Sequence, residues 1–199
     1  MKRIILSLIT ICCAAGLSAQ QLTTQQILDK TAKKVSSGCT AKFTFSNQQA
    51  GQLKGNIALK GSKFRTQLDN MTVWFDGKTQ WTYMKETDEV NISVPNATQK
   101  AQINPYTFLQ LYKKGYKYSH QLKGGNYIVK LTPENKKSSF TDIVITIRKA
   151  DLVPTDIKFQ YAGKQNHITI NQFKQQKLND GTFVFNPKQY PSAEIVDLR

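Results

Sequence analysis

Cysteine, histidine and acidic side chains are scarce in this sequence, and their scarcity excludes several classes of protein. The chain has three cysteines, two histidines and 13 acidic residues against 28 basic ones. Cys12 and Cys13 lie in the apolar N-terminal stretch, so Cys39 stands alone in the rest of the chain and no intramolecular disulfide is expected there. The fold must therefore rest on a hydrophobic core, in which we expect Cys39 to be a small buried residue.

Catalytic and metal-binding patterns are missing as well. His120 and His167 belong to no metal-ligand spacing such as H-E-x-x-H, and no glycine-rich phosphate loop occurs. The acids Glu86, Asp88 and Glu89 lie close together in sequence, and we interpret them as a solvated turn instead of a cation site. We therefore predict neither an enzyme nor a bound metal or cofactor.

The N-terminus has the layout of a secretory signal. Lys2 and Arg3 precede an apolar run over residues 4–13, and small residues follow up to Ala19. The run is shorter than the roughly 20 residues that a membrane-spanning helix needs. We predict cleavage after Ala19, a single domain over residues 20–199 and a periplasmic location.

The formal net charge is strongly positive, at +15. A concentrated basic patch is typical of nucleic-acid binding. The lysines here are scattered along the chain, and an exported protein does not routinely meet nucleic acid, so no nucleic-acid partner is predicted. Two interpretations of the charge stay open: a solvated lysine-rich face, or attraction to anionic lipid headgroups or an acidic partner.

One amphipathic helix is predicted where the mature chain begins. Thr23 or Thr24 can cap it, and Gly38 ends it. Its apolar positions follow helical spacing and are Ile27, Leu28, Ala32 and Val35. This face must be covered by another element.

From residue 40 onward, apolar and polar residues alternate with the period of β-strands. Turn residues separate the runs, and Asp76-Gly77 is the strongest hairpin signal. About ten antiparallel strands are predicted from these runs, and the last of them covers residues 183–185. Such a sheet, apolar on one face, must curl into a barrel or be covered.

The strand pattern stops at Pro95. Residues 96–114 are too many for a hairpin loop and are markedly apolar. A short helix after Pro105 fits this segment, with Asn104 as its cap and Gly115 at its end.

Aromatic residues are more numerous than the exposed face of one sheet requires. They are Phe43, Phe45, Phe64, Trp74, Trp81, Tyr83, Phe108, Tyr112, Tyr127, Phe159 and Phe173. A packed core beneath the helices accounts for some of them. A strongly curved sheet also encloses a volume that two short helices need not fill, which favours a cavity.

Several segments resemble the LolA-like outer-membrane lipoprotein carriers. Residues 73–83 are similar to the family hairpin, in which an apolar strand runs into D-G-K-T-x-W-x-Y. Residues 55–60 and 64–65 resemble the two strands before it. Residues 104–109 resemble the apolar lid segment, and residues 182–187 the closing F-x-F-x-P strand. The matches follow the family's order across nearly the whole mature chain.

The resemblance implies a mainly β (α+β) fold: an incomplete antiparallel β-barrel, or half-barrel, with an N-terminal helix and a helical lid insertion. It also implies a periplasmic carrier that holds the acyl chains of lipoproteins in a hydrophobic cavity. The implied partners are those lipoproteins, an inner-membrane lipoprotein-releasing transporter and an outer-membrane acceptor. We expect a monomer, because a dimer across the mouth of the cavity would block transfer.

The resemblance and the strand alternation together suggest the residues of the site. The expected acyl cavity is lined by Phe43, Phe45, Ile57, Leu59, Phe64, Leu68, Val73, Tyr83 and Ile145. The expected lid residues are Ile103, Tyr106, Phe108, Leu109 and Tyr112. Members of the family carry an arginine that helps to control lid closure where this chain has Gly61, after Lys60. Lys63 and Arg65 are the candidates to replace it.

Two further functions fit the same fold. One is a sensor that detects mislocalised lipid and signals to a membrane partner, which a second domain or a retained anchor would indicate. The other is a shuttle for lipids or glycolipids unrelated to lipoproteins, which the basic surface would suit.

Overall fold

The computed structural model describes residues 21–47, 51–96, 99 and 105–199. Its strands form one open sheet of twelve, in the spatial order β12-β6-β5-β4-β3-β2-β1-β11-β10-β9-β8-β7. The strands are β1 (Cys39–Asn47), β2 (Gly51–Lys60), β3 (Lys63–Leu68), β4 (Met71–Phe75), β5 (Gln80–Met84), β6 (Glu89–Ser93), β7 (Tyr116–Lys123), β8 (Asn126–Pro133), β9 (Phe140–Arg148), β10 (Pro154–Tyr161), β11 (Lys164–Gln175) and β12 (Glu194–Asp197).

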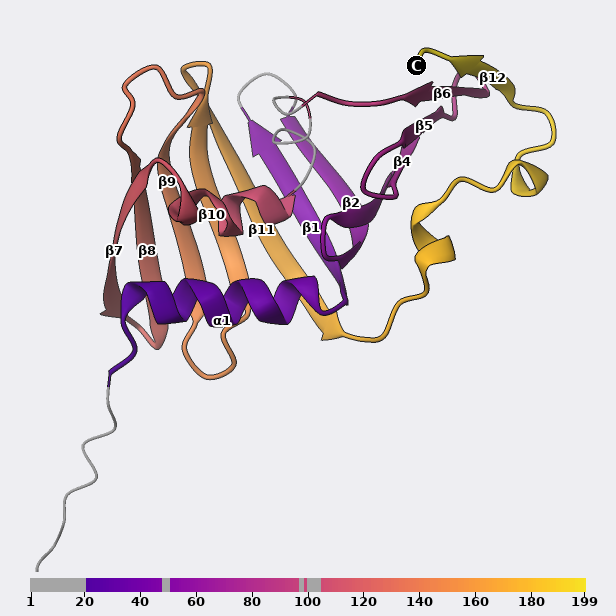
Figure 1. Cartoon of the computed structure of the whole chain (residues 1–199). Coiled ribbons are helices and arrows are strands. Elements are labelled where there is room, and N and C mark those ends of the chain that lie inside the picture. The colour runs from indigo at the N-terminus through magenta and orange to yellow at the C-terminus, as the bar shows by residue number, and fades with distance from the viewer. Residues whose placement is uncertain (1–20, 48–50, 97–98, 100–104) are drawn as a thin grey trace, which may run out of the picture.

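The sheet is a half-barrel made of two meanders that meet at β1 and β11 (Figure 1). Strands β1 to β6 extend from this junction in one direction, and strands β10 to β7 in the other. All neighbours are antiparallel except β12 and β6, which run parallel. In the described chain β12 and β7 are the two edge strands and do not pair with each other, so the barrel is incomplete, as the resemblance implied.

One helix and a short helical insertion lie on the same face of the sheet (Figure 1). They are α1 (Thr24–Ser36) and two 3₁₀ turns, η1 (Pro105–Leu109) and η2 (Leu111–Lys113), which we call the lid. We call the sheet face toward α1 and the lid the inner face, and the opposite face the outer face. The helix after Pro105 is therefore confirmed as 3₁₀, whereas its expected cap, Asn104, lies outside the described residues.

The capping of α1 follows the sequence prediction. Thr23 is the N-cap: its hydroxyl accepts from the Gln26 amide at 3.2 Å, and its own amide donates to Gln26 Oε1 at 3.0 Å. The predicted apolar positions are all buried. At its start the helix is tied to the edge strand β7, because Thr24 Oγ1 lies 2.7 Å from His120 Nδ1.

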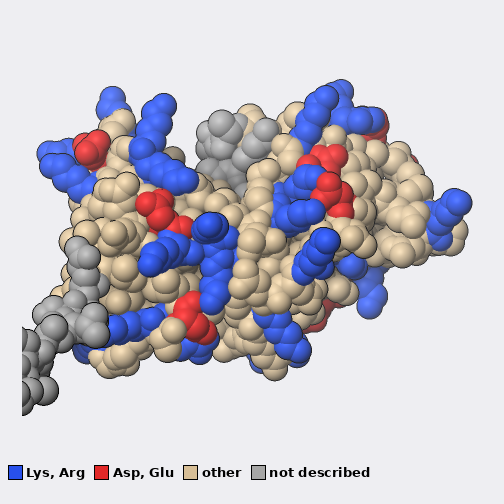
Figure 2. All heavy atoms as spheres, turned by 60° about the horizontal axis from the view of Figure 1, so that its bottom comes forward, with Lys and Arg blue, Asp and Glu red and all other residues tan. Residues whose placement is uncertain are grey.

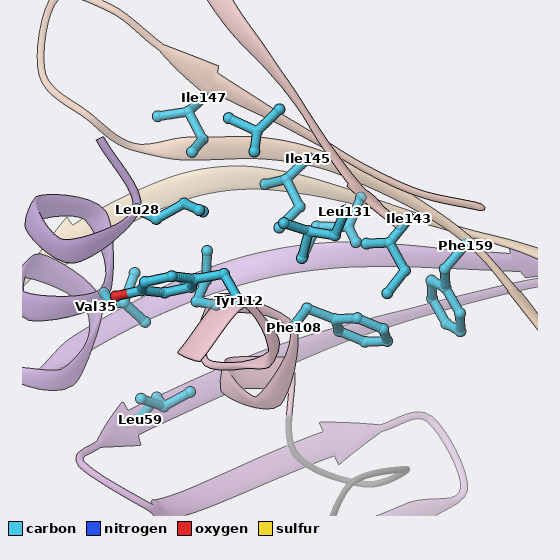
Figure 3. Packing of buried hydrophobic residues seen from close by; sticks show 14 of the residues in the cluster. Leu28, Val35, Leu59, Phe108, Tyr112, Leu131, Ile143, Ile145, Ile147 and Phe159 are labelled. Carbon is cyan, nitrogen blue, oxygen red and sulfur yellow. The ribbon is translucent and has the colours of Figure 1, made fainter. Parts of the chain in front are cut away.

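The main core lies on the inner face, between α1, the lid and strands β8 to β11 (Figure 3). Ile143, Ile145 and Ile147 alternate along β9 and have no exposed surface. Leu131 of the neighbouring β8 lies beside them, and Leu28 of α1 covers the group. Burying an aliphatic side chain of this size contributes about 1.5–3 kcal/mol, so this end of the sheet is held mainly by its core.

A second core lies on the outer face at the other end of the sheet. It contains Trp74 of β4, Val90 of β6 and Phe185 of the C-terminal segment, all buried. The Trp74 ring meets Phe185 edge-on at 5.5 Å between ring centroids. The chain from residue 176 to 193 thus runs around the outside of β4 to β6 before it adds β12 (Figure 1).

The predicted closing strand over residues 183–185 is wrong. The chain there leaves a 3₁₀ turn, η3 (Asp180–Phe183), and continues as an irregular segment to a second turn, η4 (Pro187–Gln189). Phe183 is fully buried where η3 packs against β3, while Phe185 joins the second core. Two aromatic anchors in different places hold this segment, so it needs no strand partner. The last strand, β12, follows instead.

Basic side chains outnumber acidic ones on the face shown in Figure 2, in which the bottom of Figure 1 is turned toward the viewer. Lysine and arginine side chains are spread over it, and the fewer acidic groups lie among them. In the described residues, no helix is both long and apolar enough to cross a membrane.

Candidate functional site: a lidded apolar cavity

A cavity of about 280 Å³ opens between the inner face of the sheet and the lid. Its walls come from strands on both sides of the β1–β11 junction, from α1 and from the lid. The residues that line it are Val35, Cys39, Ala41, Phe43, Phe45, Leu53, Ile57, Leu59, Phe64, Thr66, Leu68, Met71, Val73, Tyr106, Phe108, Leu109, Pro154, Ile157, Phe159, Ile168, Ile170 and Phe173. Almost every one of these side chains is apolar, and no charged group is among them.

The strand register explains why these side chains share one wall. Phe43 lies opposite Ile170, and Phe45 opposite Ile168, in the β1–β11 pair. On the other flank of β1, Phe43 lies opposite Gly55. A Cβ atom on Gly55 would lie 2.8 Å from Phe43 Cζ, so glycine makes room for the aromatic ring that forms the wall.

Cys39 is a buried residue of the cavity wall. The side chain is 4% exposed, and burial raises the pKa of its thiol to about 12. A thiol with this pKa is protonated at neutral pH and is a poor nucleophile. The prediction that Cys39 is a small buried residue is confirmed, and it lies in the cavity wall.

The lid closes the cavity with aromatic contacts. Phe108 packs on Phe159 at 4.4 Å and on Phe140 at 5.4 Å between ring centroids, and Figure 3 shows its ring directed toward Phe159. Tyr106 and Leu109 of the same 3₁₀ turn complete the cover. The contacts of Phe108 are apolar and carry no fixed donor–acceptor geometry, so a small shift of its ring breaks no hydrogen bond.

One polar contact fastens the lid to α1. The Tyr112 hydroxyl donates to Asp29 Oδ1, and the ring extends from the lid toward α1 (Figure 3). Burial, followed by this hydrogen bond, raises the pKa of Tyr112, so the hydroxyl keeps its proton at neutral pH. Tyr112 itself does not line the cavity; it holds the lid from the side.

The structure brings most of the expected residues together. Those that line the cavity as expected are Phe43, Phe45, Ile57, Leu59, Phe64, Leu68, Val73, Tyr106, Phe108 and Leu109. Ile103 lies outside the described residues. Ile145 is on the inner face but fully buried in the main core, away from the cavity wall.

Tyr83 is placed on the other side of the sheet from the cavity. It lies on the outer face in the second core, with its ring 4.6 Å from that of Tyr190. Its hydroxyl donates to Asp88 Oδ1 at 3.0 Å, and this bond raises the pKa of Tyr83. Trp74 and Trp81 share that face, because Trp74 pairs with Trp81 and Thr72 pairs with Tyr83. Tyr83 therefore does not line the cavity, contrary to the expectation.

Neither candidate for the missing family arginine reaches the lid. Lys63 Nζ pairs with Asp180 Oδ2 at 2.9 Å, and Lys60 Nζ pairs with Asp180 Oδ1 at 3.0 Å. Arg65 lies on the outer face, with its guanidinium 5.5 Å from the centre of the Trp74 ring. The Tyr112–Asp29 hydrogen bond fastens the described lid to α1, and sequence reasoning did not find it.

Several wall residues were missed because they lie far along the chain from the recognised motifs. Ile157, Ile168 and Ile170 alternate along β10 and β11, and this alternation was visible in the sequence. What it could not reveal is that β11 pairs with β1 and so faces the lid. Leu53 and Met71 were missed for a different reason, since each stands near the start of its strand, just before a recognised motif.

Potential metal ligands do not gather at one place in the described residues. No group of three or more histidine, cysteine, aspartate or glutamate side chains there could hold a metal ion. His167 contacts Asp156 and His120 contacts Thr24, at different places on the sheet.

Comparisons with known proteins agree with this architecture. The family described as outer membrane lipoprotein carrier protein LolA matches residues 16–163. An uncharacterized conserved protein from Thermus thermophilus has a similar solved structure, with 18% identity and a TM-score of 0.60 over 87% of this chain and 98% of that chain. At this identity the likeness shows the fold alone.

Two other solved structures are more distant. A LolA superfamily protein from Nitrosomonas europaea matches at 10% identity and a TM-score of 0.43, over 83% of this chain and 99% of that chain. A putative outer membrane lipoprotein-sorting protein domain from Vibrio parahaemolyticus matches at 14% identity and 0.43, over 82% and 96%. A comparison with curated proteins found no match. Because the family match covers most of the sequence, the chain belongs to the LolA family of outer membrane lipoprotein carriers.

Proposed function

We propose that this protein is a periplasmic carrier that takes up the acyl chains of lipoproteins and delivers them toward the outer membrane. The observation that supports this most is the apolar cavity of about 280 Å³ beneath a short, separately held lid. Donor and acceptor, in this proposal, are a lipoprotein-releasing transporter of the inner membrane and an acceptor at the outer membrane. The protein acts as a monomer after its signal peptide is removed.

The lining suits acyl chains better than a polar ligand. Each buried methylene contributes about 0.8 kcal/mol, so an apolar wall supplies affinity in proportion to the length of chain it covers. The wall offers few donors or acceptors, with Thr66 the only residue of β3 that brings a hydroxyl to it. A cargo without polar anchors can be released once a competing apolar site is presented, as a carrier requires.

The lid supports entry and exit. Phe108 contacts the sheet through aromatic rings, and the hydrogen bond from Tyr112 to Asp29 ties the lid to α1. Gln110 Nε2, between the two turns of the lid, is buried without a hydrogen-bond partner in the described part of the chain. A buried polar group in this state costs about 1–3 kcal/mol, which lowers the free energy needed to lift the lid.

Native mass spectrometry of the protein purified from its own cells tests the proposal directly. We expect an acylated polypeptide to co-purify and to be recovered by organic extraction. Free phospholipid or glycolipid in its place would move the assignment to a lipid shuttle, which the basic surface of Figure 2 also suits. A bare chain that also takes up no added acyl probe would refute the carrier.

A pair of neighbouring variants tests the cavity itself. Phe45 and Thr44 are adjacent in β1 and point to opposite faces; both are half-buried. We expect Phe45→Asp to abolish binding of a fluorescent palmitate analogue, because it places a charge in the apolar wall. Thr44→Asp adds the same charge on the outer face and should bind normally. Circular dichroism checks that both variants fold.

A further inference from the structure

A second hollow lies on the outer face, behind the cavity. Its floor follows one cross-strand row in which Lys174, Thr40, Ala58 and Arg65 stand side by side on β11, β1, β2 and β3. The two short side chains occupy the middle of the row and the two long basic ones its ends. Three strand spacings separate those ends, about 14 Å. The result is a depression of about 250 Å³ between two cations.

The next row adds a third cation and two carboxamides. Lys42, Asn56 and Gln67 lie side by side on β1, β2 and β3, one row from the first. All three line the same hollow. Lysine ammonium groups donate to oxyanions, and carboxamides both donate to and accept from hydroxyl groups.

A β-bulge brings a further carboxamide to the hollow. The register of β1 and β11 shifts between Thr40 and Lys42, so that Gln172 and Phe173 of β11 together face a single residue of β1. Gln172 has φ +48°, a left-handed conformation that side chains other than glycine adopt only under local constraint. Bulges of this kind re-aim side chains and often lie beside binding sites. Here the Gln172 side chain lines the hollow, while Phe173 lines the cavity.

The three cations of the hollow have no acidic partner among the described residues. The aspartates that form ion pairs with lysine, arginine or histidine are Asp151, Asp156, Asp180 and Asp197, and their partners are other basic groups. No acidic residue lines the hollow. In addition, Arg65 Nε is buried without a hydrogen-bond partner in the described chain. Positive charge is therefore concentrated here without local neutralisation.

Arg65 is held in place before any ligand arrives. Its guanidinium lies over Trp74 at 5.5 Å from the ring centre. Trp74 is itself fixed by edge-on contacts with Phe185 at 5.5 Å and Tyr190 at 5.7 Å. An arginine immobilised in this way loses less conformational entropy on binding, and its planar fork suits two oxygens of one anion.

We propose that this hollow binds the phosphate group of a small phosphorylated polyol, either free in solution or as a lipid headgroup. Lys42, Lys174 and Arg65 bind the phosphate oxygens, and the carboxamides of Asn56, Gln67 and Gln172 bind the hydroxyl groups. The hollow opens on the face opposite to the acyl cavity, so both sites can be occupied at once. The site does not depend on the carrier function.

Isothermal titration of the full-length mature protein with sn-glycerol 3-phosphate at low salt tests the site. We expect saturable binding, and a dissociation constant at least about tenfold higher in Lys42→Gln/Lys174→Gln, because hydrogen bonds to charged groups are the strong ones. Lys117→Gln/Lys130→Gln is the matched control: it removes the same charge from exposed outer-face positions on β7 and β8. It should bind as the wild type does.

Three results would overturn the proposal. The first is no saturable binding to the wild-type protein. The second is an equal loss in both double variants, which would indicate non-specific attraction. The third is equal affinity for inorganic phosphate and sn-glycerol 3-phosphate, which would remove the role given to the carboxamides.

Vesicles distinguish the two sources of the phosphate. If a lipid headgroup is the ligand, vesicles of phosphatidylglycerol should sediment the protein, vesicles of phosphatidylcholine should not, and sn-glycerol 3-phosphate should compete. The Lys42→Gln/Lys174→Gln variant should then stay in solution. If the free phosphate ester binds but vesicles do not, the ligand is a soluble ester and the site stands. Acyl-probe binding is measured in parallel, so that loss of the carrier function is recognised separately.

Discussion

The two ends of the sheet bury opposite faces. From β7 to β11 the core lies on the inner face, under α1 and the lid, and the outer face carries polar side chains such as Lys130 and Lys158. At β5 and β6 the aromatic core lies on the outer face, under the C-terminal segment. There the inner face carries Gln80, Thr82 and Asn91.

Strand β4 is where the change occurs, and both of its faces are buried. Val73 and Phe75 face the cavity side, and the Phe75 ring is tilted against the Phe64 ring at 5.4 Å between centroids, whereas Trp74 faces the second core. The cavity therefore ends at β4. Beyond this strand the sheet supports the C-terminal segment, and its inner face is too polar to extend the apolar cavity.

The largest effect on stability is expected from the second core. Trp74→Ala removes a buried indole with two aromatic partners and should lower the free energy of unfolding by about 3–5 kcal/mol. Urea denaturation measures the change. Acyl-probe binding by the folded fraction should be retained, because Trp74 faces away from the cavity. A folded variant that no longer takes up the probe would show that the two faces are not independent.

Variants of Phe43 and Ile145 distinguish the cavity wall from the packed core on the inner face. We expect Phe43→Ala to weaken acyl-probe binding about tenfold, which is the loss of roughly 1.4 kcal/mol of apolar contact. Ile145→Val removes one methylene from the packed core and should cost about 0.5–1.5 kcal/mol of stability without changing the affinity. Fluorescence titration and urea denaturation of both variants check the contrast, and a reversed pattern would contradict it.

Loss of the hydrogen bond between Tyr112 and Asp29 should change the rate of probe uptake more than it changes the fold. Tyr112→Phe removes the hydrogen bond to Asp29 and should cost about 1–2 kcal/mol of stability. It should also accelerate probe uptake in stopped-flow measurements. Tyr116→Phe is the control: it loses a 3.0 Å hydrogen bond to the Phe140 carbonyl, which does not involve α1, and should leave the uptake rate unchanged. Identical rates in all three proteins would exclude Tyr112 as the fastening of the lid.

The smallest effect concerns the ion pairs of Asp180. Hydrogen bonds from Lys63 and then Lys60 lower the pKa of this carboxyl group below its usual value of 3.8. A lowered folded-state pKa stabilises the fold above the unfolded pKa, and this contribution disappears as the pH falls through the folded pKa. Asp180→Asn should therefore lower the melting temperature slightly at pH 7 and leave it unchanged near pH 2. A difference that grows toward acid pH would reverse the assigned sign.

Much of this fold could be predicted from the sequence, and the reason is periodicity. Helical spacing identified α1 and its cap, and period-two alternation with turn residues identified the strands β1 to β11. The Asp76-Gly77 turn formed as expected: Asp76 Oδ1 accepts from the amides of Lys78 at 2.8 Å and Thr79 at 2.7 Å.

Alternation alone does not say which face of a strand is inside. Tyr83 alternates in β5 as regularly as Phe45 does in β1, yet the two residues lie on opposite faces of the sheet. The difference comes from the C-terminal segment, whose Phe185 and Tyr190 cover the outer face about a hundred residues away in sequence. Likewise, nothing in the sequence around Ile145 indicates that it packs in the core beneath α1 and does not line the cavity.

The open edges of the sheet have a consequence for what it can hold. In a closed barrel, strand number and shear fix the radius, so the interior has one size. Here β7 and β12 are free along one side in the described chain, and no ladder of hydrogen bonds closes the circumference. The sheet can therefore unroll or tighten by small changes in twist while every existing strand pair stays intact. The radius of such a wall is not fixed by closure, and neither is the volume of the cavity that the wall bounds.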